Sequence, residues 1–365
     1  YQLYLVRGDG EFARECLGSL KKQIEGERNK YGGTGDELLV ECVHQQTGKE
    51  YQPSYWYFHD FPDDCRDPSR YTPVKRVDRS VYHYLNCLGV AGLCKAVGDP
   101  EARRYEMLAE RIKGDILEKM WDETDSFFYD LHYRTDEKAK VKNIVGFYPY
   151  WAEITGERHV PGLSKLFDEH LFSTVCPFPS VAADCPVYAP EGGWRGAFIK
   201  GRNGCMWNGP SWPYTNSIVL DALAKQSKRR RHAYDKAFGR YLRQYALMHY
   251  TQRDLGRPYL VEHYNSQTGE AISDEVDYLH SYFIDLVIRH VAGLEVAPDR
   301  IVLDPADIGL EWFAIGPLYV RGRRLDISFN RDCSANSEIP PGYCLKVDGR
   351  TVFAGERLER MEFPL

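Results

Sequence analysis

The chain has 365 residues, of which 43% are hydrophobic, so it can bury the core of one large domain plus a small one. Its formal net charge is −6, whereas a protein that binds polyanions normally presents a basic face, so no nucleic-acid partner is expected. The chain lacks an apolar run of about 18 residues, which argues against a transmembrane helix and a membrane partner.

The ten cysteines are scattered and none forms a Cys-x-x-Cys pair, so neither a zinc knuckle nor a thioredoxin-type site is indicated. Scattered cysteines in a large chain favour a reducing compartment, and the cytoplasm is the location that we favour. The sequence begins with Tyr1 rather than Met, so the lack of a visible signal peptide decides nothing. The scattered histidines predict no metal site, and no motif calls for a cofactor.

A helical period dominates from residue 10 to about residue 293, after a short helical stub at 1–6. Gly98 suits the end of one helix, and Asp99-Pro100 suits the start of the next. The expected helices are 10–27, 77–97, 100–120, 141–155, 160–172, 210–226, 231–250 and 273–292.

Two long loops, 28–75 and 173–209, are rich in glycine, proline and aromatic residues. Long loops inside a compact domain are uncommon unless they are functional. Helix pairs in series, with long loops at alternate connections, favour an α/α toroid or solenoid over a βαβ fold.

After Gly293 the pattern changes to short runs, several with alternating apolar residues, and Asp348-Gly349 is typical of a hairpin turn. The sequence therefore predicts a helical domain over 1–293 and a small antiparallel β-domain over 294–365.

Glu262 is the best candidate for a catalytic base. It follows a helix and precedes turn-forming residues. A carboxylate at the mouth of a helical barrel, beside His263 and Tyr264, can orient water as an inverting glycosidase requires. From spacing alone, a Glu that caps a loop or forms an ion pair is the better interpretation.

A second cluster, residues 55–67, combines four aspartates with aromatic side chains, among them Trp56. An acid held beside aromatic faces and other carboxylates has a raised pKa, which a general acid needs near neutral pH. The alternatives are a turn-forming Asp-Pro loop and, matching less well, a calcium-binding loop.

Trp207 and Trp212 flank Gly209-Pro210 just before an expected helix, which suits either a rigid wall for stacking a sugar or ordinary core packing. The loop 190–196 adds Trp194 and a spare carboxylate, Glu191. It suits a substrate lid and a plain surface loop equally.

Residues 206–216 resemble the Trp-x-Gly-Pro-x-Trp-x-x-x-Asn segment of glycoside hydrolase family 63 and the mannosylglycerate hydrolase-like group, to which trehalases are more distantly related. Residues 262–269 resemble the Glu-x-Tyr-Asn-x-x-Thr-Gly segment of that group, whose Glu is the general base. The resemblance covers most of 1–293. It implies that Glu262 is the base and places five residues at the substrate site: Trp207, Trp212, Asn216, His263 and Tyr264.

The resemblance also implies a mainly α fold, an (α/α)6 toroid of six helical hairpins with a small C-terminal β-domain. The expected helices fall short of six hairpins at the N-terminal side. An incomplete toroid would expose apolar helix faces, so we expect a missing N-terminal segment or a partner chain, such as a homo-oligomer, to cover them.

The general acid of the group is the first Asp of a Ser-Gly-x-Asp-Asp/Asn-x-Pro-Arg segment shortly before a helix that bears Val/Leu-Asp. Asp63 lies 15 residues before Asp78 (78 − 63), although no Ser-Gly precedes it. Asp63 is therefore the first choice, with Asp60 and Asp64 as alternates. Glu50, in Thr47-Gly48-Lys49-Glu50-Tyr51, is an outside candidate.

The sequence thus predicts inverting hydrolysis of a glycoside, in which Asp63 protonates the leaving oxygen while Glu262 activates water across a gap of about 6.5–9.5 Å. The side chains expected to pack the sugar are Trp56, Trp194, Trp207 and Trp212. One alternative is a sugar epimerase or isomerase on a related α/α barrel, which relies on histidine acid/base pairs. Another is a non-catalytic carbohydrate-binding protein.

Overall fold

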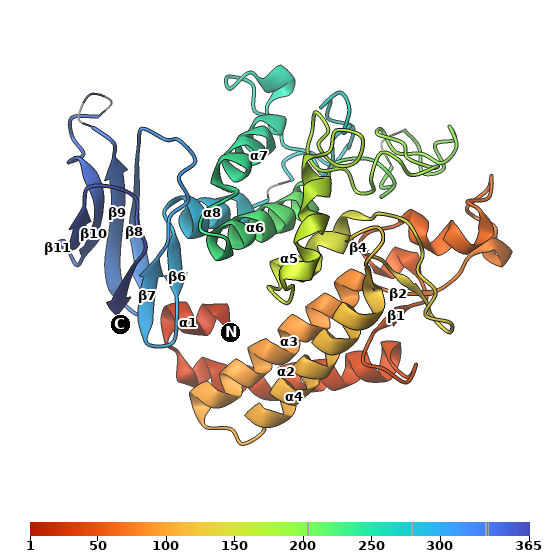
Figure 1. The fold of residues 1–365 in the computed structure, drawn as a ribbon, viewed down its shortest axis with the longest axis horizontal. Coiled ribbons are helices and arrows are strands. Elements are labelled where there is room, and N and C mark those ends of the chain that lie inside the picture. Colours follow the sequence, from red (N-terminus) through yellow and green to blue (C-terminus); the bar gives the residue numbers. More distant parts are fainter. Residues whose placement is uncertain (203, 279, 333, 335) are drawn as a thin grey trace.

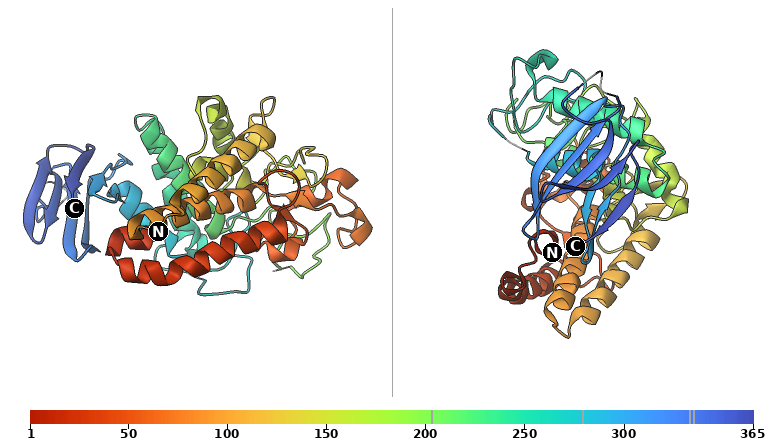
Figure 2. Two further views of the ribbon diagram at one scale, coloured as in Figure 1. Left: turned by 90° about the horizontal axis from the view of Figure 1, so that it is seen from below. Right: turned by 90° about the vertical axis from the view of Figure 1, so that its left-hand side faces the viewer.

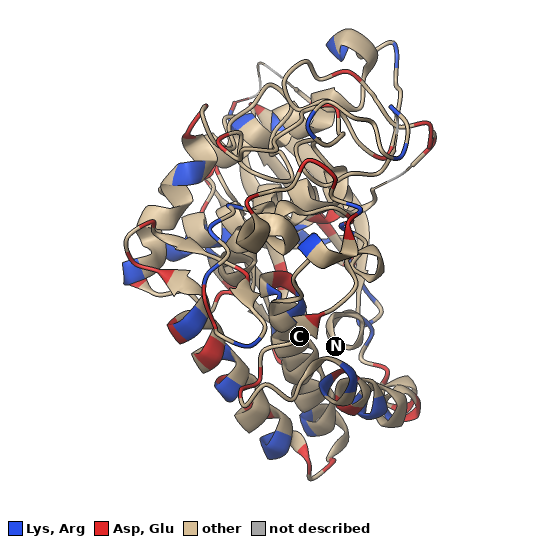
Figure 3. Ribbon diagram, turned by 90° about the vertical axis from the view of Figure 1, so that its right-hand side faces the viewer, with Lys and Arg blue, Asp and Glu red and all other residues tan. Residues whose placement is uncertain are grey.

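A computed structural model describes residues 1–202, 204–278, 280–332, 334 and 336–365 of the chain. Helices occupy the middle of the molecule, antiparallel sheets form one end, and long loops gather away from the sheets (Figure 1, Figure 2). Lysine and arginine alternate with aspartate and glutamate along the helices (Figure 3). Within the described ranges, every helix is too short or too polar to cross a membrane.

The N-terminal helices lie where the sequence predicts them. They are α1 (Gln2–Arg7), α2 (Gly10–Tyr31), α3 (Val77–Val97) and α4 (Ala102–Asp115), which continues as a π-helical turn to Met120. The Asp9 side chain caps α2 by accepting a hydrogen bond from the N–H of Phe12 at 2.9 Å. Gly98 ends α3 with φ of 74°, as a helix C-cap requires. α3 packs against both α2 and α4.

The second group of helices comprises α5 (Tyr148–Trp151), α6 (Pro213–Arg229), α7 (Asp235–Met248) and α8 (Tyr282–Leu286). α6 is central and packs against the other three. It begins with Pro213, whose missing N–H costs nothing in the first helical turn.

Three predicted helices are wrong in extent. Residues 141–155 contain only the 3-10 turn Ile144–Phe147 and the short α5. Residues 157–167 form 3-10 turns, because Pro161 lies inside them and cannot donate the hydrogen bond of a regular helix. Among the described residues of 273–292, only α8 and a π-helical turn (Val287–Val291) are helical.

The described residues before α8 pair with the loop that carries Glu262 instead of coiling. Val276 forms a bridge to Val261, and the N–H of Glu262 donates to the carbonyl of Glu275 at 3.2 Å. Leu279 lies outside the described residues. Residues 273–278 therefore pair with the loop that carries Glu262 and do not form a helix.

The C-terminal part holds two antiparallel sheets. One has the order β11-β10-β9-β8, from Arg350–Gly355, Gly342–Val347, Arg323–Asn330 and Trp312–Val320. The other has the order β12-β7-β6, from Met361–Pro364, Arg300–Leu303 and Leu294–Val296. Asp348 and Gly349 have φ of 50° and 79°, which suits a type I′ turn, so the predicted hairpin is confirmed.

The connections between the helices are locally ordered. Short strands β1 (Val40–Glu41), β2 (Val74–Lys75) and β5 (Leu131–His132) form one small sheet, and β3 (Trp121–Asp122) pairs with β4 (Phe127–Phe128). Further 3-10 turns are His44–Gln46, Pro53–His59, Pro68–Arg70 and Thr251–Arg253.

Two apolar clusters hold these parts together. The larger contains residues of the helices and of both C-terminal sheets. The smaller joins the two long loops, and Trp56 and Trp194 lie at its centre with ring centroids 5.1 Å apart. The loops that the sequence marks as functional therefore pack against one another.

Candidate active site

Glu262 lies on a loop that doubles back on itself. Val261 bridges Val276, and Tyr264 bridges Ser211 just before α6. The hydroxyl of Tyr264 accepts a hydrogen bond from the N–H of Val261 at 3.1 Å, which closes the backbone around Glu262. The Glu262 side chain is 24% exposed, so water can reach it.

The residues after Tyr264 close the turn of this loop. The Asn265 side-chain oxygen accepts hydrogen bonds from the N–H groups of Gln267 and Thr268, at 2.9 and 3.0 Å. Gly269 has φ of 77°, a left-handed conformation that glycine adopts without strain. The Asn-x-x-Thr-Gly spacing is thus that of a turn which presents the Glu.

Trp207, Trp212 and His263 form a stack of three rings. The two indoles lie 4.0 Å apart at 7°, and the His263 ring lies 4.3 Å from that of Trp212. All three are buried, and burial lowers the pKa of His263 to about 4. His263 is therefore neutral near neutral pH, and the stack is the wall behind Glu262.

Gly209 and Asn216 hold the segment that carries Trp207 and Trp212 in place. A Cβ on Gly209 would lie 2.1 Å from the carbonyl oxygen of Ala189, so only glycine fits there. The Asn216 amide binds both the N–H and the carbonyl of Phe178, at 2.5 and 3.0 Å. Asn216 is buried and fixes the backbone of the loop that contains Phe178.

Glu50 follows a tight turn. The hydroxyl of Thr47 donates to the carbonyl of His44 at 2.7 Å and accepts from the N–H of Lys49 at 2.8 Å. Gly48 has φ of 66°, which the turn requires. The turn directs Glu50 toward the segment before α6.

Glu50 contacts the segment Cys205–Trp207, where the charge of Glu262 also acts. The N–H of Trp207 donates to the Glu50 carbonyl at 2.8 Å, and the Cys205 thiol lies 3.1 Å from a carboxyl oxygen of Glu50. Burial, Glu50 and Glu262 together raise the pKa of the Cys205 thiol. Both carboxyls, which come from loops far apart in the sequence, therefore act electrostatically on the same thiol.

The pKa of Glu262 is raised above its ordinary value. Burial is the largest cause, and the carboxyls of Glu275 and Glu50 add to it, whereas Lys200 opposes it. A carboxylate whose pKa is raised is a stronger base once it is ionised. Among the described residues, no group of three or more His, Cys, Asp or Glu side chains could hold a metal ion.

Glu50, the outside candidate from the sequence, lies in a segment that partly matches the acid motif described above. In Thr47-Gly48-Lys49-Glu50-Tyr51-Gln52-Pro53-Ser54, Thr stands in place of Ser and Glu in place of Asp, and both exchanges keep the chemistry of the side chain. Tyr51 and Ser54 depart from the Asp/Asn and Arg of the motif. The segment lies 28 residues before Asp78 (78 − 50), farther than the spacing used to choose Asp63.

The three aspartates chosen from the sequence lie at the surface. Asp60 is exposed, and the Asp63 side chain is fully exposed, 3.5 Å from Arg195. Asp64 is exposed and accepts hydrogen bonds from Arg66, which lowers its pKa, the opposite of what a general acid needs.

Trp56 and Trp194 lie inside the cluster that joins the two loops, and both are 0% exposed. The Trp56 indole donates to the carbonyl of Cys65 at 3.0 Å, and that of Trp194 donates to the carbonyl of Pro62 at 2.7 Å. Their faces are turned to protein rather than to solvent, which suits a supporting role.

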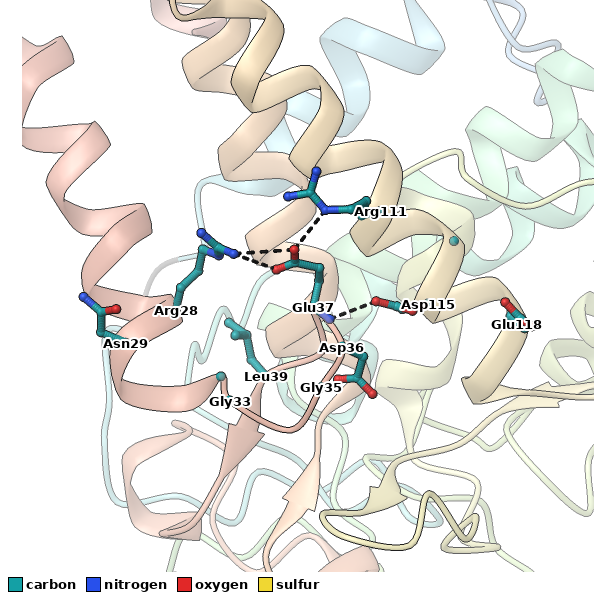
Figure 4. A pocket seen from close by; sticks show the side chains of 12 residues that line it. Arg28, Asn29, Gly33, Gly35, Asp36, Glu37, Leu39, Arg111, Asp115 and Glu118 are labelled. Atoms are coloured by element: carbon teal, nitrogen blue, oxygen red, sulfur yellow. Dashed lines mark hydrogen bonds and ion pairs between the residues drawn. The ribbon is translucent and has the colours of Figure 1, made fainter.

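A hollow of ≈ 740 Å³ lies elsewhere, between the end of α2 and α4 (Figure 4). Its wall contains Glu37, which accepts hydrogen bonds from Arg28 at 3.1 Å and Arg111 at 2.9 Å. The Asp115 carboxyl accepts from the N–H of Glu37 at 2.8 Å. The charged groups of this wall thus bond to one another. Neither Glu50 nor Glu262 lines the hollow.

The model of one protein family, described as the mannosylglycerate hydrolase MGH1-like glycoside hydrolase domain, matches residues 1–281. The chain belongs to this family. The resemblance drawn from the segments 206–216 and 262–269 is confirmed, and both segments lie within the MGH1-like match.

A curated relative from Borreliella burgdorferi, an uncharacterized protein, is 26% identical over 205 residues, which is 52% of this chain and 40% of that protein. This MGH1-like chain therefore spans less than half of that relative.

Solved structures share the fold. A chain described as a sialidase superposes with a TM-score of 0.84 at 22% identity, over 98% of this chain and 32% of that one. A GH63 mannosylglycerate hydrolase from Thermus thermophilus, in complex with glucose, superposes with a TM-score of 0.57 at 18% identity, over 76% of this chain and 70% of that one. A GH78 rhamnosidase of Bacillus sp. GL1 superposes with a TM-score of 0.57 at 14% identity, over 94% of this chain and 30% of that one. The predicted mainly helical fold with C-terminal antiparallel sheets is confirmed.

Proposed function

We propose that the chain hydrolyses a glycosidic bond with inversion at the anomeric carbon, with Glu262 as general base and Glu50 as general acid. The observation that carries this proposal is that Glu50, whose carboxyl lies beside the Cys205 thiol, acts electrostatically on Glu262, each glutamate coming from a loop with a family-like pattern. Glu50 gives its proton to the leaving oxygen. Glu262 takes a proton from the water that attacks the opposite face of the sugar.

Glu50 suits the role of acid better than Asp63. A general acid must lie within reach of the leaving oxygen, across the substrate from the base. Glu50 is partly buried and its carboxyl contacts Cys205, whereas the Asp63 side chain is fully exposed beside Arg195. Inversion further requires about 6.5–9.5 Å between the acid and the base.

A carbohydrate substrate would lie against the exposed faces of Tyr214 and Tyr278, which are 39% and 41% exposed. Tyr278 lies close enough to Glu262 for that carboxyl to raise its pKa, after the larger effect of burial. The buried residues Trp207, Trp212, Asn216, His263 and Tyr264 would shape this wall from behind. We further propose that the helical hairpins are part of an (α/α)6 toroid; the N-terminal segment, the homo-oligomer and the cytoplasmic location stay predictions.

The test is a panel of α- and β-linked mannosides, glucosides and rhamnosides, with the anomer of the first product identified by NMR. Glu262→Gln and Glu50→Gln should each lower kcat/KM about 10²–10⁴-fold while the far-UV circular dichroism is unchanged.

Four outcomes would contradict the proposal. A product that keeps the anomeric configuration would make one of the two glutamates a nucleophile. Full activity of Glu262→Gln would place the base elsewhere. Isomerised sugar without hydrolysis would favour an epimerase, and calorimetric binding without product would favour a carbohydrate-binding protein.

A further inference from the structure

Lys49, which precedes Glu50, is held in a buried cage. Its side chain is 2% exposed, and its ammonium nitrogen lies 3.0 Å from a carboxyl oxygen of Asp78. The same nitrogen lies over the rings of Tyr82, Tyr148 and Tyr214, at 5.5, 6.0 and 5.2 Å from their centroids. These residues belong to the first two turns of α3, α5 and α6, so Lys49 joins the starts of three helices.

The anion in this cage is firmly ionised. Burial alone would raise the pKa of Asp78, but Arg76 and Lys49 outweigh burial and hold that pKa far below its ordinary range. Arg76 donates two hydrogen bonds to the Asp78 carboxyl, at 3.0 and 3.1 Å. Asp78 also lies in the first turn of α3, where the helix dipole favours a negative charge.

We propose, resting on the function proposed above, that Lys49 is a positioning residue which fastens the Glu50 loop to α3, α5 and α6 and thereby aims the Glu50 carboxyl. Lys49 is too deeply buried to touch a substrate, so it acts through the residue next to it. Glu50 is then held from two sides, by the caged Lys49 on one and by Cys205 and Trp207 on the other.

Positioning of an acid matters most when the leaving group needs a proton. A methyl glycoside releases an alkoxide unless the acid protonates the oxygen as the bond breaks, whereas a 2,4-dinitrophenyl glycoside releases a stable phenolate without that proton. A misplaced acid therefore slows the first substrate and spares the second. General damage to the fold or to the base slows both equally.

The experiment compares kcat/KM of Lys49→Met and of the wild type on the methyl and dinitrophenyl glycosides of the sugar that the wild type cleaves. We expect Lys49→Met to lose about 10²-fold on the methyl glycoside, as displacement of a reacting group by about 1 Å does, and little on the dinitrophenyl glycoside. Lys49→Arg, which keeps the charge, should recover part of the loss.

Lys75→Met is the matched control. Lys75 is also 2% exposed and pairs with a buried carboxylate, Asp36, at 2.7 Å, but in the small sheet of β2 rather than in the cage. Its loss should lower the melting temperature and leave the ratio of the two rates unchanged. If Lys49→Met does not fold, Lys49→Gln, which can still donate to Asp78, replaces it.

Equal losses on both glycosides, or a wild-type ratio in a folded Lys49 variant, would overturn the proposal. Glu50→Gln separates this failure from that of the acid assignment. If Glu50→Gln shows the leaving-group dependence and the Lys49 variants do not, only the positioning role falls. If Glu50→Gln lacks the dependence, the acid assignment itself is wrong.

Discussion

Asp221 is fully buried and Glu262 is partly buried, yet their surroundings act on the two carboxyls in opposite directions. Asp221, on α6, accepts hydrogen bonds from the side chains of Tyr282, Trp151 and His290, at 2.6, 2.8 and 2.6 Å. Lys225 lies 3.5 Å away. Burial alone would raise the pKa of Asp221, but Lys225 and His290 outweigh it and hold that pKa well below its ordinary range.

Glu262 has the reverse environment. Burial and the like charges of Glu275 and Glu50 raise its pKa, and the exposed Lys200 opposes them. Asp221 therefore stabilises the fold as an anion, whereas Glu262 as an anion costs stability. A carboxylate surrounded by hydrogen-bond donors and cations stabilises the fold. A carboxylate near other carboxylates has a raised pKa and accepts a proton more readily.

The largest expected effect is on stability at Asp221. Asp221→Asn should lower the free energy of unfolding by about 3–5 kcal/mol at pH 7, because the cations around it lose their buried partner. The folded pKa of Asp221 is lowered, so its stabilisation is present above the unfolded pKa and is lost as the pH falls toward the folded pKa. Urea unfolding at pH 7 and at about pH 2, well below the unfolded pKa of Asp, measures both statements. A variant as stable as the wild type at pH 7 would contradict them.

Glu262→Gln should act in the other direction. The folded pKa of Glu262 is raised, so the ionised side chain destabilises the protein above the unfolded pKa. The variant should unfold at a higher urea concentration than the wild type at pH 7, and the gain should vanish below about pH 4, where Glu is protonated in both states. A loss of stability at pH 7 would mean that Glu262 is structural after all.

A smaller effect concerns the acidic limb of the pH profile of kcat/KM. The base must be ionised, so activity falls as the pH drops through the raised pKa of Glu262. Glu275→Gln removes a like charge and should move this limb to lower pH. Lys200→Met removes the opposing cation and should move it to higher pH.

Both shifts should shrink at 1 M salt, because Glu275 and Lys200 are exposed and salt screens exposed charges. Shifts in the same direction for the two variants would exclude Glu262 as the titrating base. The neutral His263 would not account for the limb, since burial lowers its pKa to about 4.

The parts of the fold that could be predicted are those decided by neighbouring residues. The uninterrupted period of 77–97 and the turn at Asp348-Gly349 both reappear in the structure. The predicted helix 160–172 is wrong because a helical period tolerates Pro161 whereas a regular helix does not. The predicted helix 273–292 is wrong over 273–278 because the partner of this stretch, the Glu262 loop, is a tertiary contact that no local pattern contains.

The site follows the same division. The turn that carries Glu262 could be predicted, since Asn265 and Gly269 mark it locally. The contact of Glu50, the proposed acid, with Cys205 could not, because the two residues are 155 positions apart in the sequence. Sequence spacing favoured Asp63, and spacing says nothing about which loop reaches the centre.

The smallest expected effect is therefore at Asp63. Asp63→Asn removes an exposed carboxyl that lies 3.5 Å from Arg195, so stability should change by less than about 0.5 kcal/mol and kcat/KM should stay at the wild-type value. The measurement is hydrolysis of the methyl glycoside, the substrate that depends most on an acid. A loss of about 10²-fold or more there, absent on the dinitrophenyl glycoside, would make Asp63 the acid. The loop 60–64 would then have to close over the sugar in the complex. Glu50 would then influence the acid only through its charge and would not be the proton donor.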